Sequence, residues 1–66
     1  HHMTWGTVKI GGAEYVAAFR EPDVIEVHNL TAGTEVRKVT IDGTARNVVV
    51  LERYESRVVL GVKRGK

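Results

Sequence analysis

Cysteine is missing from this chain of 66 residues, and proline occurs only once. The lack of cysteine excludes disulfide bonds and thiolate metal sites, which are the usual supports of very small domains. No apolar run approaches the roughly 18 residues that span a bilayer, and no signal peptide is visible. We therefore expect a single small domain without a membrane segment, and we favour a cytoplasmic location.

Catalytic side chains are equally scarce. Ser56 is the only serine, and His28 is the only histidine outside the first two positions. No nucleophile motif surrounds Ser56, and nothing in the pattern brings it close to His28. Glu52 and Glu55 flank one turn, where we expect them to pair with neighbouring arginines rather than act as a catalytic pair. The sequence therefore predicts a protein that is not an enzyme and has no cofactor.

The first half of the chain alternates apolar and polar residues, which predicts strands near 4–10, 13–20 and 24–29. Gly11-Gly12 fits a tight turn between the first two. Residues 13–20 also fit a short helix, but the strand and turn before them favour a strand. Glu26 and His28 fall on one face of the third strand, and two such ligands are too few for a closed metal site.

The second half contains stronger turn signals. Asp42-Gly43 lies between two β-branched runs and predicts a type I′ hairpin, because that turn requires positive φ at both central residues. The expected strands cover 34–41, 44–53 and 57–64. The spacing of apolar residues breaks near Arg37-Lys38, which predicts a β-bulge there.

These elements predict an all-β fold, a five- or six-stranded antiparallel small barrel or compact sandwich of SH3 or OB size, without a helix. We expect it to cover 4–64, between an expression-tag remnant with a start methionine at 1–3 and a basic tail at 65–66. The expected core residues are apolar and mostly aliphatic: Val8, Ile10, Tyr15, Phe19, Ile25, Val27, Val39, Ile41, Val49, Leu51, Val58, Leu60 and Val62.

One strand carries a continuous apolar run, Val48-Val49-Val50-Leu51. Such a run has apolar side chains on both faces, which fits a strand that crosses from one sheet to another. A domain this small has difficulty burying two apolar faces. We therefore predict a homo-oligomer or a larger protein partner, with either Val48 and Val50 or Val49 and Leu51 at the contact. The alternative is a monomer in which a second sheet buries the run.

Charge is distributed unevenly. Residues 1–33 carry two Lys or Arg against four Asp or Glu, a net charge of −2, and residues 34–66 carry eight against four, a net charge of +4. This split fits a polyanion partner, a contact between copies, or simply a solvated surface. Small barrels bind single strands through basic side chains and exposed aromatics. The candidate polyanion-binding residues are Arg37, Lys38, Arg46, Arg53, Tyr54, Arg57, Lys63 and Arg64, with Trp5 as a further exposed aromatic.

The hairpin VVVLERYESRVVLGVKRG, at 48–65, resembles a strand pair in the carbon storage regulator family of RNA-binding dimers. The resemblance covers less than a third of the chain, and the N-terminal strand and C-terminal helix of that family are not found around it. We therefore predict a non-enzymatic β module for self-assembly or protein interaction, of the ring-forming, virion or tail component, or adaptor type. The alternative is a nucleic-acid-binding small barrel that uses the basic half.

Overall fold

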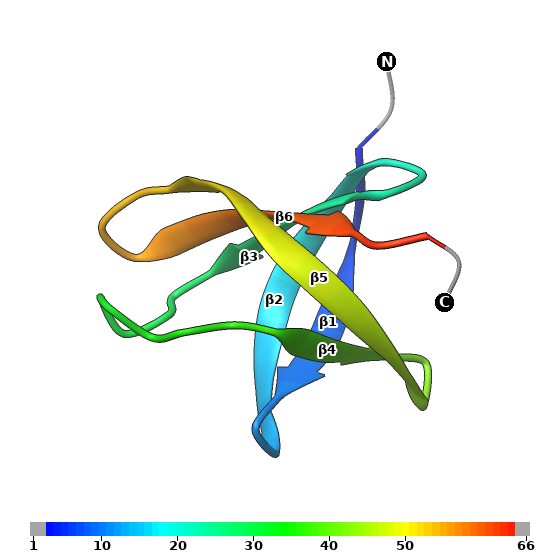
Figure 1. The fold of residues 1–66 in the computed structure, drawn as a ribbon, viewed down its shortest axis with the longest axis horizontal. Helices are drawn as coiled ribbons and strands as arrows, with labels where there is room; N and C mark the ends of the chain where they lie inside the picture. Colours follow the sequence, from blue (N-terminus) through cyan, green and yellow to red (C-terminus); the bar gives the residue numbers. More distant parts are fainter. Residues whose placement is uncertain (1–2, 65–66) are drawn as a thin grey trace.

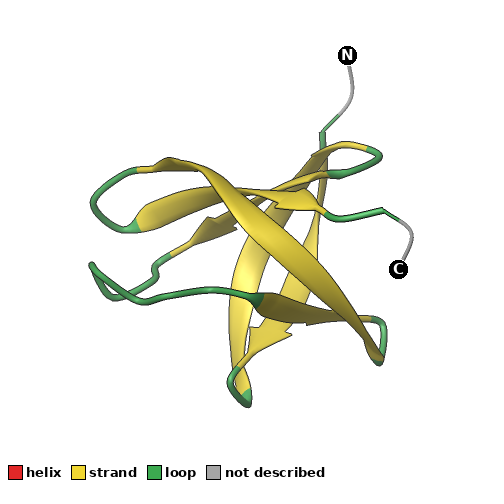
Figure 2. Cartoon of the chain, in the orientation of Figure 1, coloured by secondary structure: helices red, strands yellow, loops and turns green. Residues whose placement is uncertain are grey.

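A computed structural model describes residues 3–64, which fold into six antiparallel strands and no helix (Figures 1 and 2). The strands close into a barrel in the order β1-β2-β3-β6-β5-β4, which confirms the predicted small all-β barrel. Their bounds are β1 Thr4–Ile10, β2 Ala13–Glu21, β3 Val24–His28, β4 Lys38–Ile41, β5 Thr44–Arg53 and β6 Arg57–Val62. The expected tag remnant and basic tail lie outside the described residues, apart from Met3. None of the described residues belongs to a helix able to cross a membrane.

Two glycine-containing turns fix the register of two hairpins. Gly11 and Gly12 have φ of 58° and 88°, and Asp42 and Gly43 have φ of 51° and 81°. Both pairs therefore adopt the positive φ values that a type I′ turn requires. The strand predicted for residues 13–20 is confirmed as β2, and it pairs along its length with β1.

The long strand β5 pairs with two neighbouring strands. Its first part, 44–47, pairs with β4, and its second part, 48–53, pairs with β6. In Figure 1 it crosses the front of the barrel diagonally. The expected crossing from one sheet to another is not found, because all six strands belong to one sheet that closes into the barrel. The barrel closes between β1 and β4, and this seam is short, because the two strands share a single ladder pair, Lys9 with Thr40.

The bulge predicted at Arg37-Lys38 is wrong. Residues 34–37 precede β4 as irregular chain, so the odd spacing there marks the start of a strand. Val36 turns inward and is buried, while the carbonyl oxygen of Arg37 accepts a hydrogen bond from the Val48 amide at 2.9 Å. The ladders contain bulges elsewhere, at Arg20 in β2 and at Leu51 in β5.

The barrel interior holds most of the predicted core. Val8, Ile25, Val27, Val39, Val58 and Leu60 are fully buried, and Ile10, Tyr15, Phe19, Ile41 and Val62 pack partly buried around them. Leu30 and Val36, from the chain between β3 and β4, fill the same cluster.

Val49 and Leu51 were predicted in the core, and this is wrong, because both point outward and are exposed. Alternation turns Val48 and Val50 into the barrel and Val49 out of it. The same alternation turns Leu51 outward, and the bulge leaves it without a ladder partner.

Candidate functional site

The first candidate site is an apolar patch on the outside of β5, formed by Val49, Leu51 and the neighbouring Gly61 of β6. Val49 and Leu51 are 47% and 56% exposed. Val49 pairs directly with Gly61, and a Cβ built on Gly61 would approach the Leu51 side chain to 3.2 Å. The glycine therefore lets Leu51 lie flat against the β6 backbone. We call these three residues the β5 outer patch.

The structure divides the apolar run predicted as an oligomer contact into two pairs. Val48 is buried in the core, and Val50 packs partly buried against it. Val49 and Leu51 are covered by no other strand of the described chain. Of the two pairs predicted from the sequence, only Val49 and Leu51 are available to a second molecule.

Charges of opposite sign lie at the two ends of the β5 outer patch. Lys38 and Lys63 flank β5 at Asn47, through a ladder pair and a backbone hydrogen bond respectively. Glu52 follows Leu51 and pairs with Val59 on the outward face. The patch is therefore basic beside Val49 and acidic beside Leu51.

The second candidate site lies on the outside of β2, β3 and β6 and is centred on Glu26. This carboxylate is nearly buried between Ala18 of β2 and Val59 of β6, which are its ladder neighbours. A buried carboxylate is costly unless it is paired and hydrogen-bonded. Arg57 supplies the pairing, with its Nε 2.8 Å from Glu26 Oε2.

Two further basic side chains surround the same carboxylate at greater distances. Nε2 of His28 lies 3.7 Å from Glu26 Oε2, and Nη1 of Arg20 lies 3.9 Å from Glu26 Oε1. Both distances exceed that of a hydrogen bond. We call Glu26, Arg20, His28 and Arg57 the Glu26 cluster.

Aromatic rings stand at two edges of the Glu26 cluster. The ring of Trp5 lies 5.3 Å from that of His28, at a tilt of 49°. The guanidinium of Arg57 lies 4.2 Å above the ring of Tyr54, a cation–π arrangement. Trp5 and Tyr54 are 58% and 43% exposed, so the exposure predicted for both is confirmed. Arginine and histidine thus link the two exposed aromatic rings to one buried carboxylate.

Some of the predicted polyanion-binding residues already contact carboxylates of the chain. Three of them are in ion pairs: Arg57 with Glu26, Arg64 with Asp23 at 2.7 Å, and Arg37 with Glu35 at 3.0 Å. Tyr54 lies beneath Arg57. Within residues 3–64, Lys38, Arg46, Arg53 and Lys63 have no carboxylate within 4.0 Å.

The charge split between the two halves is largely compensated inside the chain. Glu26 and Asp23, from the acidic half, contact Arg57 and Arg64 from the basic half. These contacts follow from the pairing of β3 with β6, which joins the two halves of the barrel. The split therefore gives little support to a contact between oppositely charged halves of two copies.

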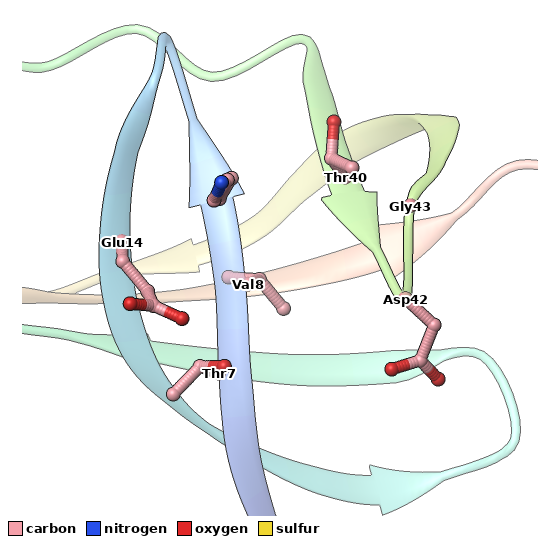
Figure 3. Close-up of a pocket in the computed structure, with 7 residues that line it drawn as sticks. Thr7, Val8, Glu14, Thr40, Asp42 and Gly43 are labelled. Atoms are coloured by element: carbon pink, nitrogen blue, oxygen red, sulfur yellow. The ribbon is translucent and has the colours of Figure 1, made fainter.

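A cavity of about 230 Å³ lies at the short seam between β1 and β4 (Figure 3). Figure 3 shows the Glu14 carboxyl group on the β2 side of β1 and that of Asp42 on the side of the β4–β5 turn. The seven lining residues include no histidine, serine or cysteine: Thr7, Val8, Lys9, Glu14, Thr40, Asp42 and Gly43. None of the side-chain hydrogen bonds within residues 3–64 joins two of these residues, so we assign no reaction to this cavity.

The Glu26 cluster was not found from the sequence. Alternation correctly placed Glu26 and His28 on one outward face, and the Gly11-Gly12 turn could have paired Trp5 with Ala18. The contact with Arg57 depends on the pairing of β3 with β6, two strands far apart in sequence, and local patterns carry no signal for it. Among residues 3–64, no three His, Asp or Glu side chains come close enough to hold a metal ion.

Comparisons with protein-family models, curated proteins and solved structures found no match to this chain. The two outer faces of the barrel are the features of the molecule that bear on its function.

Proposed function

We propose that this chain is a non-enzymatic interaction module that self-associates through the β5 outer patch. The observation that supports this function most directly is the outward exposure of Val49 and Leu51 on a strand whose other face fills the core. A large apolar side chain gains roughly 1.5–3 kcal/mol when it moves from full exposure to full burial. Burial of two half-exposed side chains on each of two molecules therefore contributes a free energy that is substantial beside the small stability of such a domain.

Charge complementarity favours a second copy of the chain as the partner. In a two-fold dimer the same patch meets itself, and two β5 strands can cross in opposite directions. The basic end, with Lys38 and Lys63, then approaches Glu52 at the acidic end of the other copy. The apolar centre supplies most of the affinity, and the charged ends fix the relative direction of the strands.

Sedimentation of the wild-type chain and two variants tests the proposal. We expect the wild type to sediment as a dimer or larger assembly at about 100 µM, well above typical weak dissociation constants. The double variant Val49→Thr, Leu51→Thr should be monomeric with unchanged far-UV circular dichroism. The matched control is Val16→Thr, because Val16 is an equally exposed outward valine of β2. It should associate like the wild type.

Salt separates an apolar contact from a purely ionic one. Association through the β5 outer patch should persist or strengthen in ammonium sulfate, because sulfate favours apolar burial. A wild-type monomer at every concentration, or an assembly that survives in the double variant, would contradict the proposal. The proposal also places the chain in the cytoplasm, as the sequence predicted, and fractionation of the source cells tests that location.

Nucleic-acid binding by the basic half is the second candidate function. The four cations without a carboxylate partner among the described residues, Lys38, Arg46, Arg53 and Lys63, favour it. It ranks second because Arg37, Arg57 and Arg64 already contact carboxylates. In a gel-shift series such binding should weaken steeply as salt rises, because it is driven by counterion release. Charge reversal of Arg53 should remove the shift if this half of the chain is responsible.

A further inference from the structure

The face between Trp5 and Tyr54 has a different composition from the β5 outer patch. Five side chains follow one another across it, Trp5, His28, Glu26, Arg57 and Tyr54, each in contact with the next. One side of the Trp5 ring lies towards His28, and more than half of the side chain remains exposed. Trp5 is thus an oriented aromatic surface, held by its neighbour and open to a planar ligand.

Arg20 adds an available positive charge beside this surface. It is the extra residue of the β2 bulge, and Ala18, two residues before it, pairs with Trp5. Its contact with Glu26, at 3.9 Å, is too long for a hydrogen bond, and its side chain is 49% exposed. Arg57 makes the shortest ion pair with Glu26, at 2.8 Å. The guanidinium of Arg20 is therefore free of a hydrogen-bonded carboxylate in the described chain.

We propose that this face binds single-stranded nucleic acid, with one base stacked on Trp5 and an adjacent phosphate on Arg20. Single strands alternate planar bases with phosphates, and proteins bind them through aromatic stacking surfaces beside basic side chains. Arginine suits the phosphate, because its planar fork can donate two parallel hydrogen bonds. Tyr54 offers a second exposed ring at the far edge of the face, but the arginine above it, Arg57, is already paired with Glu26.

The chemistry of the face distinguishes this ligand from two others. A polyanion without rings would use the cations but gain nothing from Trp5. A peptide rich in proline or aromatic residues would use the rings but gain nothing from Arg20. Only a ligand that carries both groups engages both residues. The β5 outer patch contributes no residue to this site, so self-association and nucleic-acid binding can be tested separately.

Fluorescence of Trp5, the only tryptophan in the chain, provides a direct test. We expect a deoxythymidine 12-mer to quench it in a saturable way, because stacking places a base against the indole ring. Inorganic polyphosphate should leave the emission nearly unchanged. The single phosphate contact on Arg20 predicts that affinity falls only about threefold between about 50 and 200 mM salt. Quenching by a proline-rich peptide but not by the oligonucleotide would overturn the proposal in favour of a protein ligand.

Variants identify the site independently of the tryptophan signal. Binding of a labelled 12-mer, followed by anisotropy, should weaken at least tenfold in Trp5→Leu and several-fold in Arg20→Ala. Two matched controls, Arg46→Ala and Lys63→Ala, also remove one positive charge each and should bind like the wild type after correction for net charge. If a control loses as much affinity as Arg20→Ala, the basic half binds the strand and the proposed site is wrong. Absence of binding by the wild type at about 50 mM salt would also refute it.

Discussion

The two β-bulges of the barrel each insert one unpaired residue into a strand, but one lies in a charged surface and the other in an apolar one. The bulge in β2 adds Arg20 to an outward face where a carboxylate and two basic side chains already lie. The bulge in β5 adds Leu51 to an outward face where its neighbours are Val49 and Gly61. Each bulge places two consecutive outward residues on one strand, and the side chains around it decide what the surface can bind.

The difference shows why outward position alone does not identify a binding face. In the Glu26 cluster the almost fully buried Glu26 is paired with Arg57 within the chain. In the β5 outer patch the apolar groups have no covering element among the described residues. Apolar surface that the fold leaves open is a stronger indication of a protein partner than charge that the fold has already paired.

The largest expected effect contrasts two leucines on neighbouring strands. Leu60 of β6 is fully buried, whereas Leu51 of β5 is mostly exposed. Leu60→Ala should lower the free energy of unfolding by about 2–5 kcal/mol, because it removes transferred apolar area and leaves a cavity. Leu51→Ala should cost about 1 kcal/mol or less under conditions where the chain is monomeric. Urea unfolding of the two variants measures the difference, and equal losses would mean that Leu51 is a core residue.

Removal of the Glu26 charge is expected to have the second largest effect. Glu26→Gln should lower the free energy of unfolding by about 1–3 kcal/mol, because Arg57 loses its charged ion-pair partner at a nearly buried site. Glu35→Gln is the matched control, because its pair with Arg37 is exposed on both sides. It should change stability by less than about 0.5 kcal/mol. If both substitutions have the same small effect, the Glu26 cluster does not stabilise the barrel.

Gly61→Ala should separate association from stability. A Cβ at this position lies 3.2–3.3 Å from Leu51, which is exposed and can tilt away. We expect the free energy of unfolding of the monomer to change by no more than about 1 kcal/mol. The displaced Leu51 should weaken self-association measurably in a sedimentation series. Unfolding of the variant at ordinary temperatures would show instead that the contact of Leu51 with Gly61 holds β5 to β6.

Arg20→Ala should have the smallest effect on stability. Its contact with Glu26 is long and half exposed, so its loss should cost less than about 0.5 kcal/mol. Arg57→Ala removes the short contact and should cost clearly more. The comparison is made by thermal unfolding at low salt, where surface charge effects are largest. A loss for Arg20→Ala as large as that for Arg57→Ala would show that both arginines are needed to hold Glu26.

The local patterns of the sequence predicted the strands well, because turn chemistry and alternation are local signals. Gly11-Gly12 and Asp42-Gly43 require positive φ, and both positions became the expected turns. The predictions failed where an interaction was not local. Both faces of the run Val48–Leu51 are apolar, so alternation could not tell which pair turns inward, and Val49 and Leu51 were wrongly placed in the core.

The two candidate sites differ in how far the sequence could reveal them. The run Val48–Leu51 predicted an apolar face that the domain does not cover, and the structure identifies Val49 and Leu51 as its exposed residues. The Glu26 cluster combines residues from β2, β3 and β6, and it exists only because β3 pairs with β6 across the barrel. No spacing in the sequence encodes that pairing, so the cluster appears only in three dimensions.

The single residue pair between β1 and β4 has a consequence for how the molecule moves. Every other pair of neighbouring strands shares four to seven ladder pairs. The sheet is therefore closed into a barrel by one ladder pair, Lys9 with Thr40. We expect the barrel to open at this margin first, while the remaining ladders stay formed. Backbone amides of β1 that face β4 should therefore exchange with deuterium through local opening. Amides between β3 and β6 should exchange only through global unfolding.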